Sequence, residues 1–211
     1  MSWPIRAKEQ EEADRFYGAL GRCIAQWSEL EFIAGGLFFR VTKLSRDQAK
    51  VIFHSGRNWR TKTEMLNAAI STAKLPPGLR DALTAIVDRS GYYASFRNAI
   101  AHDMLQLEPV WVARGGNRRE LCLRPHVASL EPIYDEGALR RQQLENGAKN
   151  ISLLSAVMIH ALNRSPTDQL GAPERLRLLV SLLPAAAHHT PPDPSAEEQI
   201  LLGIKPLHFP K

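Results

Sequence analysis

The sequence predicts an all-α protein, an up-down bundle of four to five helices with a small β-hairpin insertion and a proline-rich C-terminal tail. Long stretches carry apolar residues at alternating steps of three and four, which is typical of amphipathic helices. Eight of the 14 prolines lie after residue 164. We therefore expect a helical domain over 1–164 and an extension over 165–211. The extension is expected to be partly helical near 173–183 and to form a tail or an extended arm over 185–211.

The first and longest predicted helix runs from Glu9 to Lys43. A single apolar stripe marks its buried face: Phe16, Leu20, Cys23, Trp27, Leu30, Ala34, Leu37 and Val41. Gly35-Gly36 lies inside this pattern and indicates either a bend or the close approach of another helix. Ser45, followed three positions later by Gln48, forms a capping box and predicts a second helix that ends near His54.

The remaining elements follow in order along the chain. A third helix is expected from residue 58 or 59 to 74, and the turn Pro76-Pro77-Gly78 begins a fourth helix that continues to Ile100. Strand-like spacing on both sides of two glycines then predicts a hairpin over about 108–125. A fifth helix, from about Asp135 to Asn163, completes the predicted bundle.

Composition and charge exclude several classes of protein. The 211 residues include 27 lysines and arginines against 22 aspartates and glutamates, and a net charge of +5 permits an anionic partner without requiring one. No apolar run approaches the ~18 residues of a membrane span. No signal sequence is recognisable, Cys23 and Cys122 form no metal-binding pattern, and the common nucleotide-binding, hydrolase and zinc-protease motifs are absent. We expect a cytoplasmic protein with no metal, no cofactor and no membrane contact.

The segment 93–103 lies near the end of the fourth predicted helix. At ~100° per residue, with Ile100 set at zero, Tyr93 and Phe96 lie within about 40° of Ile100 and mark the direction of the core. The helix is therefore expected to turn its other side outward.

Three polar side chains share that outward side. Asn98 and His102 lie at about 160° and 200°, and Arg97, at about 60°, can reach the same face past Ala94 and Ala101. A guanidinium matches phosphate oxygens in a planar fork, an imidazole that titrates near ~6.5 transfers protons at neutral pH, and an amide orients either group. The three residues together suit a phosphodiester.

The same residues also fit structural roles. Arg97 can form a surface ion pair with Asp103 or Glu108, His102 can offset the dipole at the end of the helix, and Asn98 can be hydrated. Spacing alone leaves both interpretations open.

The stretch Phe96-Arg97-Asn98-Ala99-Ile100-Ala101-His102 resembles the Arg-x4-6-His signature of the HEPN superfamily, whose name refers to a nucleotide-binding domain of higher eukaryotes and prokaryotes. Arginine followed by asparagine, with histidine at the end, is the commonest form of that signature. The surroundings are also similar over residues 9–163: a long first helix with Trp27-Ser28-Glu29-Leu30-Glu31, a basic third helix with Arg60-Thr61-Lys62, and the motif late in the fourth helix.

The resemblance implies a metal-independent endoribonuclease of the kind found in toxin–antitoxin, phage-defence or RNA-processing systems. Arg97 and His102 would be catalytic and Asn98 would support them. The expected substrate is single-stranded RNA, cleaved by attack of a ribose 2'-OH on the neighbouring phosphate, with Arg57 and Lys62 as further RNA-binding residues.

The expected assembly is a two-fold homodimer whose motif helices face each other, with an antitoxin or a regulatory protein as a further partner. No tyrosine follows His102 within four residues, although members paired with a nucleotidyltransferase antitoxin typically carry one. The hairpin after the motif would cap or obstruct the site. The alternative is a non-catalytic module whose outward face holds a nucleotide or packs on another protein.

Overall fold

The computed structural model describes residues 7–102, 104–112, 116–124, 139–162 and 172–190. These contain six helices: α1 (Ala7–Thr42), α2 (Arg46–Ser55), α3 (Trp59–Thr72), α4 (Pro77–His102), α5 (Arg141–Leu162) and α6 (Ala172–Leu182). They also contain three strands: β1 (Met104–Val112), β2 (Gly116–Arg124) and β3 (Leu139–Arg140). The predicted class, all-α with a β-hairpin insertion, is confirmed.

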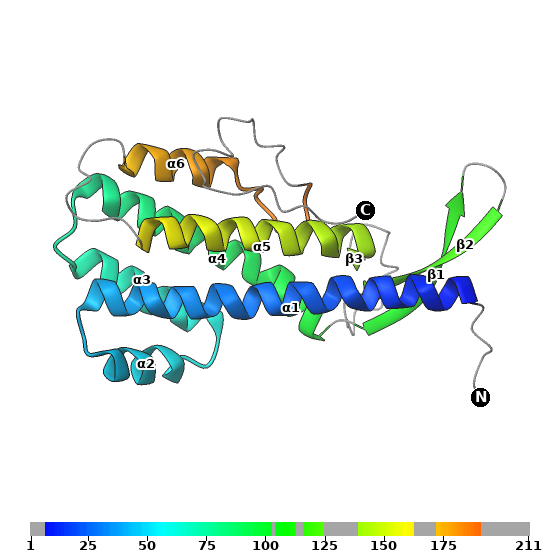
Figure 1. Ribbon diagram of the computed structural model, residues 1–211, viewed down its shortest axis with the longest axis horizontal. Coiled ribbons are helices and arrows are strands. Elements are labelled where there is room, and N and C mark those ends of the chain that lie inside the picture. Colours follow the sequence, from blue (N-terminus) through cyan, green and yellow to red (C-terminus); the bar gives the residue numbers. More distant parts are fainter. Residues whose placement is uncertain (1–6, 103, 113–115, 125–138, 163–171, 191–211) are drawn as a thin grey trace, which may run out of the picture.

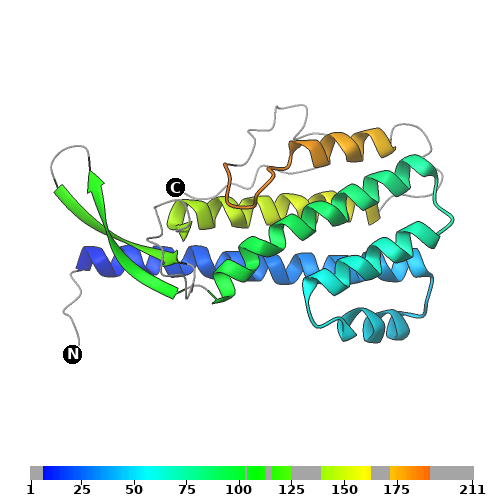
Figure 2. The ribbon, with the colours of Figure 1, turned by 180° about the vertical axis from the view of Figure 1, so that it is seen from behind.

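Successive helices alternate in direction, and α1 and α5 lie side by side (Figure 1). α1 spans the length of the bundle, and α5 runs along it in the same direction. The two are joined by a hydrogen bond from Cys23 Sγ to the carbonyl of Leu144 (2.9 Å) and by the ion pair of Glu12 with Arg141 (3.0 Å). α4 crosses behind them in the opposite direction, as the view from behind shows (Figure 2).

The apolar stripe of α1 forms the centre of the core. Every residue of the predicted stripe is buried except Leu20, which is partly buried. The helix continues unbroken through Gly35 and Gly36. A Cβ at Gly35 would meet the ring of Phe53 on α2 at 3.3 Å, and one at Gly36 would meet Leu162 on α5 at 3.8 Å. The two glycines therefore mark the close approach of neighbouring helices.

Side-chain caps fix the starts of the two short helices. The hydroxyl of Ser45 accepts a hydrogen bond from the backbone N–H of Gln48, and the side chain of Gln48 accepts one from the N–H of Ser45, so the predicted capping box is present. Asn58 accepts from the backbone N–H of Thr61 (2.8 Å) and caps α3 in the same way.

The β-sheet is larger than the predicted hairpin. β1 follows α4 closely and pairs with β2 from Met104↔Arg124 to Val112↔Gly116, and β3 pairs with the other side of β2. The predicted start of the fifth helix was wrong for residues 139–140, because Leu139 pairs with Leu123 and both are buried in the core. α5 then begins at Arg141, and Gln143 accepts a hydrogen bond from the N–H of Arg140 (2.7 Å). Residues 135–138 lie outside the described part of the chain.

Residues 172–190 pack on the bundle. Leu176, Leu179 and Val180 of α6 and Ala187 belong to the common core. Asn150 on α5 donates to the carbonyls of Ala187 (2.7 Å) and His189 (2.8 Å), and Tyr93 on α4 donates to the carbonyl of Pro184 (3.1 Å). Burial raises the pKa of Tyr93, which keeps its hydroxyl protonated as a donor. The start of the expected tail, 185–190, is thus a strap held by two helices.

One contact sets how α4 faces α5. Phe96 is 3% exposed and packs against Gly147, where an added Cβ would lie 2.1 Å from the ring. The ring of His188, in the strap, stacks on the same phenyl group at 6.3 Å. Only glycine at position 147 leaves room for this arrangement.

We predict that Gly147→Ala lowers the free energy of unfolding by a net ~1–3 kcal/mol, because the methyl group and the phenyl ring would compete for the same space. Gly91→Ala is the matched control on α4, since an added Cβ there meets nothing within 4 Å. Alanine at position 91 should raise stability by about 0.5–1 kcal/mol. Urea unfolding of both variants measures the two effects, and equal stabilisation by both would contradict the packing described for Phe96.

Candidate active site

The core fixes the orientation of the last turns of α4. Tyr93, Phe96 and Ile100 are 0%, 3% and 8% exposed, as their helical spacing predicts. Because all three point into the bundle, the opposite side of the helix has to face outward.

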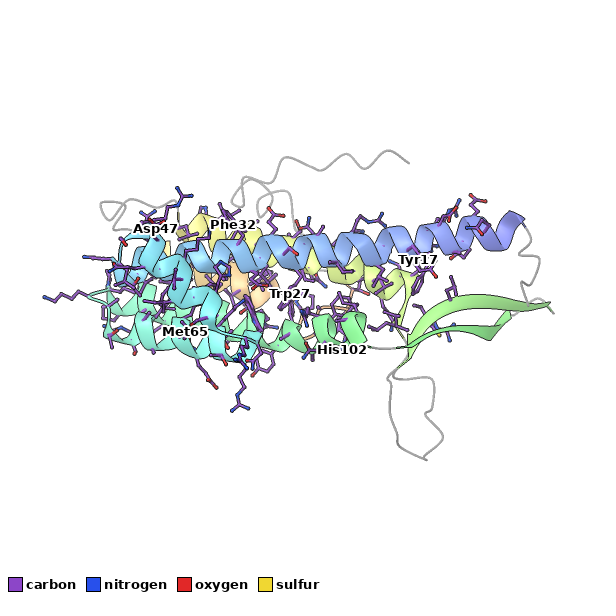
Figure 3. The ribbon with its side chains drawn as sticks, turned by 90° about the horizontal axis from the view of Figure 1, so that it is seen from below. Tyr17, Trp27, Phe32, Asp47, Met65 and His102 are labelled. Atoms are coloured by element: carbon purple, nitrogen blue, oxygen red, sulfur yellow. The ribbon has the colours of Figure 1, made fainter. Side chains whose placement is uncertain are left out.

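That outward side carries the predicted polar residues. Asn98 and His102 are exposed and Arg97 is partly exposed. Arg97 Nη1 donates a hydrogen bond to Asn98 Oδ1 at 3.3 Å, so the amide orients the guanidinium. His102, four positions after Asn98, is in the last turn and lies on the same face of the helix. Figure 3 labels it at the end of α4.

The sheet begins directly beyond this site. Met104, at the start of β1, pairs with Arg124 at the end of β2, so the base of the hairpin lies two residues from His102. Figures 1 and 2 show β1 and β2 extending past the end of α4, beside the N-terminal part of α1. The hairpin does not run back along α4.

Lys62 lies inside the bundle. It is 8% exposed, its ammonium group forms an ion pair with Glu31 of α1, and it lies 5.7 Å from the centre of the Phe53 ring. Lys62 is therefore buried, whereas Asn98 and His102 are exposed. The sequence contained a signal for it: Trp59, Lys62 and Leu66 follow the spacing of a buried helical stripe, and all three are buried.

Arg57 differs from Lys62 in exposure. It lies in the link between α2 and α3 and is exposed. The next aromatic residue, Trp59, packs edge-on against Trp27 of α1 at 4.9 Å and donates from Nε1 to the carbonyl of Ser90 on α4 (3.1 Å). Arg57 is therefore attached to a well-anchored part of the bundle while its own side chain remains accessible.

Among the described residues, no cluster of three or more histidine, cysteine, aspartate or glutamate side chains is arranged to hold a metal ion. Within the same part of the chain, none of the helices has the length and apolarity required to cross a bilayer.

The chain was also compared with known proteins. No model of a protein family, no curated protein and no solved structure matches it.

We predict that Lys62→Met lowers the free energy of unfolding, whereas Arg57→Ala changes it by less than about 0.5 kcal/mol. Glu31 keeps some contact with water, so the loss for Lys62→Met should be about 1–3 kcal/mol, below that of a fully buried pair. Urea unfolding measures both changes. If Arg57 contacts RNA, as the sequence predicts, Arg57→Ala should instead weaken binding of a single-stranded oligoribonucleotide. If Lys62→Met weakens that binding more while leaving stability intact, the structural role of Lys62 is refuted.

Proposed function

We propose that the protein is a metal-independent endoribonuclease that cleaves single-stranded RNA and acts as a toxin or a phage-defence effector. The observation that carries this proposal is the outward face of α4, where Arg97 is held by Asn98 and His102 follows one turn later. The resemblance of this stretch to the HEPN signature supports the same chemistry.

The two charged groups have distinct roles in the proposed reaction. A guanidinium has five N–H donors, so the single bond from Arg97 to Asn98 leaves others for phosphate oxygens. The ribose 2'-OH attacks the adjacent phosphorus, a P–O bond forms, and the 5' oxygen leaves with the second RNA fragment. Arg97 stabilises the negative charge that develops on the phosphate. His102 transfers a proton, as general base toward the 2'-OH or as general acid toward the leaving oxygen.

The proton transfers favour a dimer. One group has to accept a proton and another has to donate one, but each chain contributes a single motif histidine. A two-fold axis beside α4 supplies the second histidine from the partner. The outward face of α4 has low relief that suits such an approach, because Gly91, Ser95 and Ala101 are small and exposed. An antitoxin or another regulatory protein would bind the same face or its rim.

A second candidate function rests on Tyr92. This residue is 67% exposed on α4, about 80° around the helix axis from His102. An exposed aromatic ring provides a stacking surface for a base or a packing surface for a protein. A non-catalytic module that binds nucleotide or protein through this face would use Tyr92 and the motif residues without cleaving RNA.

We predict that His102→Ala lowers the rate of cleavage of mixed RNA in EDTA by about 10²–10⁴-fold, because general acid–base catalysis is lost. The thermal unfolding transition should stay cooperative, since the side chain is exposed. His54→Ala is the matched control, because His54 is also exposed and also lies in the last turn of a helix. It should retain full activity.

Two results would decide against the nuclease. Wild-type protein that binds nucleotide or protein but leaves RNA intact in EDTA would favour the non-catalytic module. Loss of the cooperative transition in the His102→Ala variant would show that His102 is structural.

We predict that His102→Ala subunits inhibit wild-type subunits in mixed dimers. If each site needs both histidines, equal amounts of the two chains, unfolded and refolded together, should retain about a quarter of the wild-type activity, because only that fraction of dimers pairs two wild-type chains. Mixing with His54→Ala gives the reference for undiminished activity. Retention of half the activity would mean that each chain acts alone.

A further inference from the structure

α1 also carries exposed apolar side chains beside its core stripe, on a side that Phe53 of α2 approaches at Gly35. Four of its large apolar side chains are exposed to solvent: Tyr17 (52%), Ile24 (51%), Phe32 (74%) and Phe39 (41%). At ~100° per residue they fall within about 80° of one another, so they form one stripe along the helix. We call these four residues the outer stripe. Large exposed apolar side chains that gather on one side of a helix are a feature of interaction sites.

The spacing of the residues in the outer stripe is symmetric about its centre. Its members are separated by seven, eight and seven positions, and Ser28 lies at the centre. If a second copy of α1 lies antiparallel on this face, with a two-fold axis at Ser28, then Tyr17 meets Phe39 and Ile24 meets Phe32. A two-fold axis pairs residue i of one copy with residue j of the other, so in this register every large side chain of the outer stripe meets another one.

The charges at the ends of the stripe fit the same arrangement. Asp14 is exposed on the side of the outer stripe, and Lys43 is exposed directly after the last residue of α1. The two-fold axis at Ser28 places Asp14 opposite Thr42, next to Lys43 of the other copy. Each end of the interface then pairs a carboxylate with an ammonium group. A parallel arrangement in the same register would place Asp14 against Asp14.

We propose that the outer stripe of α1 binds the same stripe of a second copy of this chain in antiparallel orientation. The contact from Tyr17 to Phe39 would extend over ~33 Å, about the diameter of a small domain. Gly21 and Ser28 lie between the large residues, and an added Cβ at Gly21 meets nothing within 4 Å of this chain. Such small residues allow two helices to approach closely, near the short end of the usual 8–10 Å between axes.

This surface is separate from the candidate active site, and the proposal does not rest on the proposed function. In Figure 3, Phe32 is labelled on the α1 side of the bundle and His102 on the opposite side. A chain that self-associates through both faces would form assemblies larger than a dimer. One two-fold axis would lie beside α4 and the other at Ser28. The assembly is a closed tetramer if these axes cross at right angles and an open chain if they do not intersect.

A cysteine placed on the two-fold axis tests the geometry directly. In Ser28→Cys the two copies of residue 28 face each other at the closest approach of the helices, within the 4.4–6.8 Å Cα separation typical of disulfides. Mild oxidation of the full-length variant at micromolar concentration should yield covalent dimers on a non-reducing gel. Arg22→Cys is the control: it is also exposed on α1, but its two copies would lie ~18 Å apart along the axis. The native cysteines are buried, and burial raises the pKa of Cys23 to about 12, so the thiolate needed for exchange is not formed at neutral pH.

A charge exchange tests the proposed partner. Asp14→Lys and Lys43→Asp should each weaken association, because like charges then meet at both ends, and the double variant should restore it. Phe32→Glu should lower the mass measured by light scattering without changing the circular dichroism spectrum. The proposal is overturned if Ser28→Cys cross-links no more than Arg22→Cys, or if Phe32→Glu keeps both its fold and the wild-type mass. Because none of these variants touches Arg97, Asn98 or His102, RNA cleavage reports separately on the proposed function.

Discussion

The seating of Phe96 against Gly147 is the contact on which the arrangement of this protein depends. It sets the rotation of α4 about its own axis, since the ring fits α5 only where no Cβ intervenes. That rotation decides which residues of the motif face outward. It also provides the surface on which His188 stacks, so the strap lies where it does because the same ring supports it. A hydrophobic contact made inside the bundle thus determines the chemistry presented outside it.

Periodicity and capping were sufficient to predict most of the helical structure. The stripe on α1, the capping box at Ser45 and the turn before α4 are local signals, since each depends on residues within a few positions. β3 was not predicted, because Leu139 and Arg140 carry no strand signal of their own. They are extended because β2 offers them a partner at Cys122 and Leu123. The packing of the strap on the bundle was not predicted for a related reason. The carbonyls of Ala187 and His189 accept hydrogen bonds from Asn150, which lies 37 to 39 positions earlier in the chain.

In the candidate site too, features set by local sequence were predicted and features set by tertiary contacts were not. The outward placement of Asn98 and His102 follows from helix geometry, and the exposure of both residues agrees with it. Lys62 was expected on an RNA-binding surface because, with Arg57, it belongs to a concentration of basic residues that would make the cleft positively charged. Its position between Trp59 and Leu66 in a buried stripe was a signal against that expectation, but the compensating carboxylate comes from Glu31, 31 positions earlier on α1. A buried charge can be predicted from sequence only when its partner is known, and that partner is a property of the tertiary structure.

The parallel pairing of α1 with α5 has a consequence for folding while the chain is being synthesised on the ribosome. The two helices meet through contacts such as that of Cys23 with Leu144, which are 121 residues apart in sequence. At ~5–20 residues per second, the apolar side of α1 would wait several seconds or longer for its main partner to be synthesised. During that interval Trp27 can already find Trp59, whereas Cys23 has to wait for Leu144. The nascent chain therefore presents an amphipathic helix without a core, which is the form of polypeptide that chaperones bind and that aggregates when they are scarce.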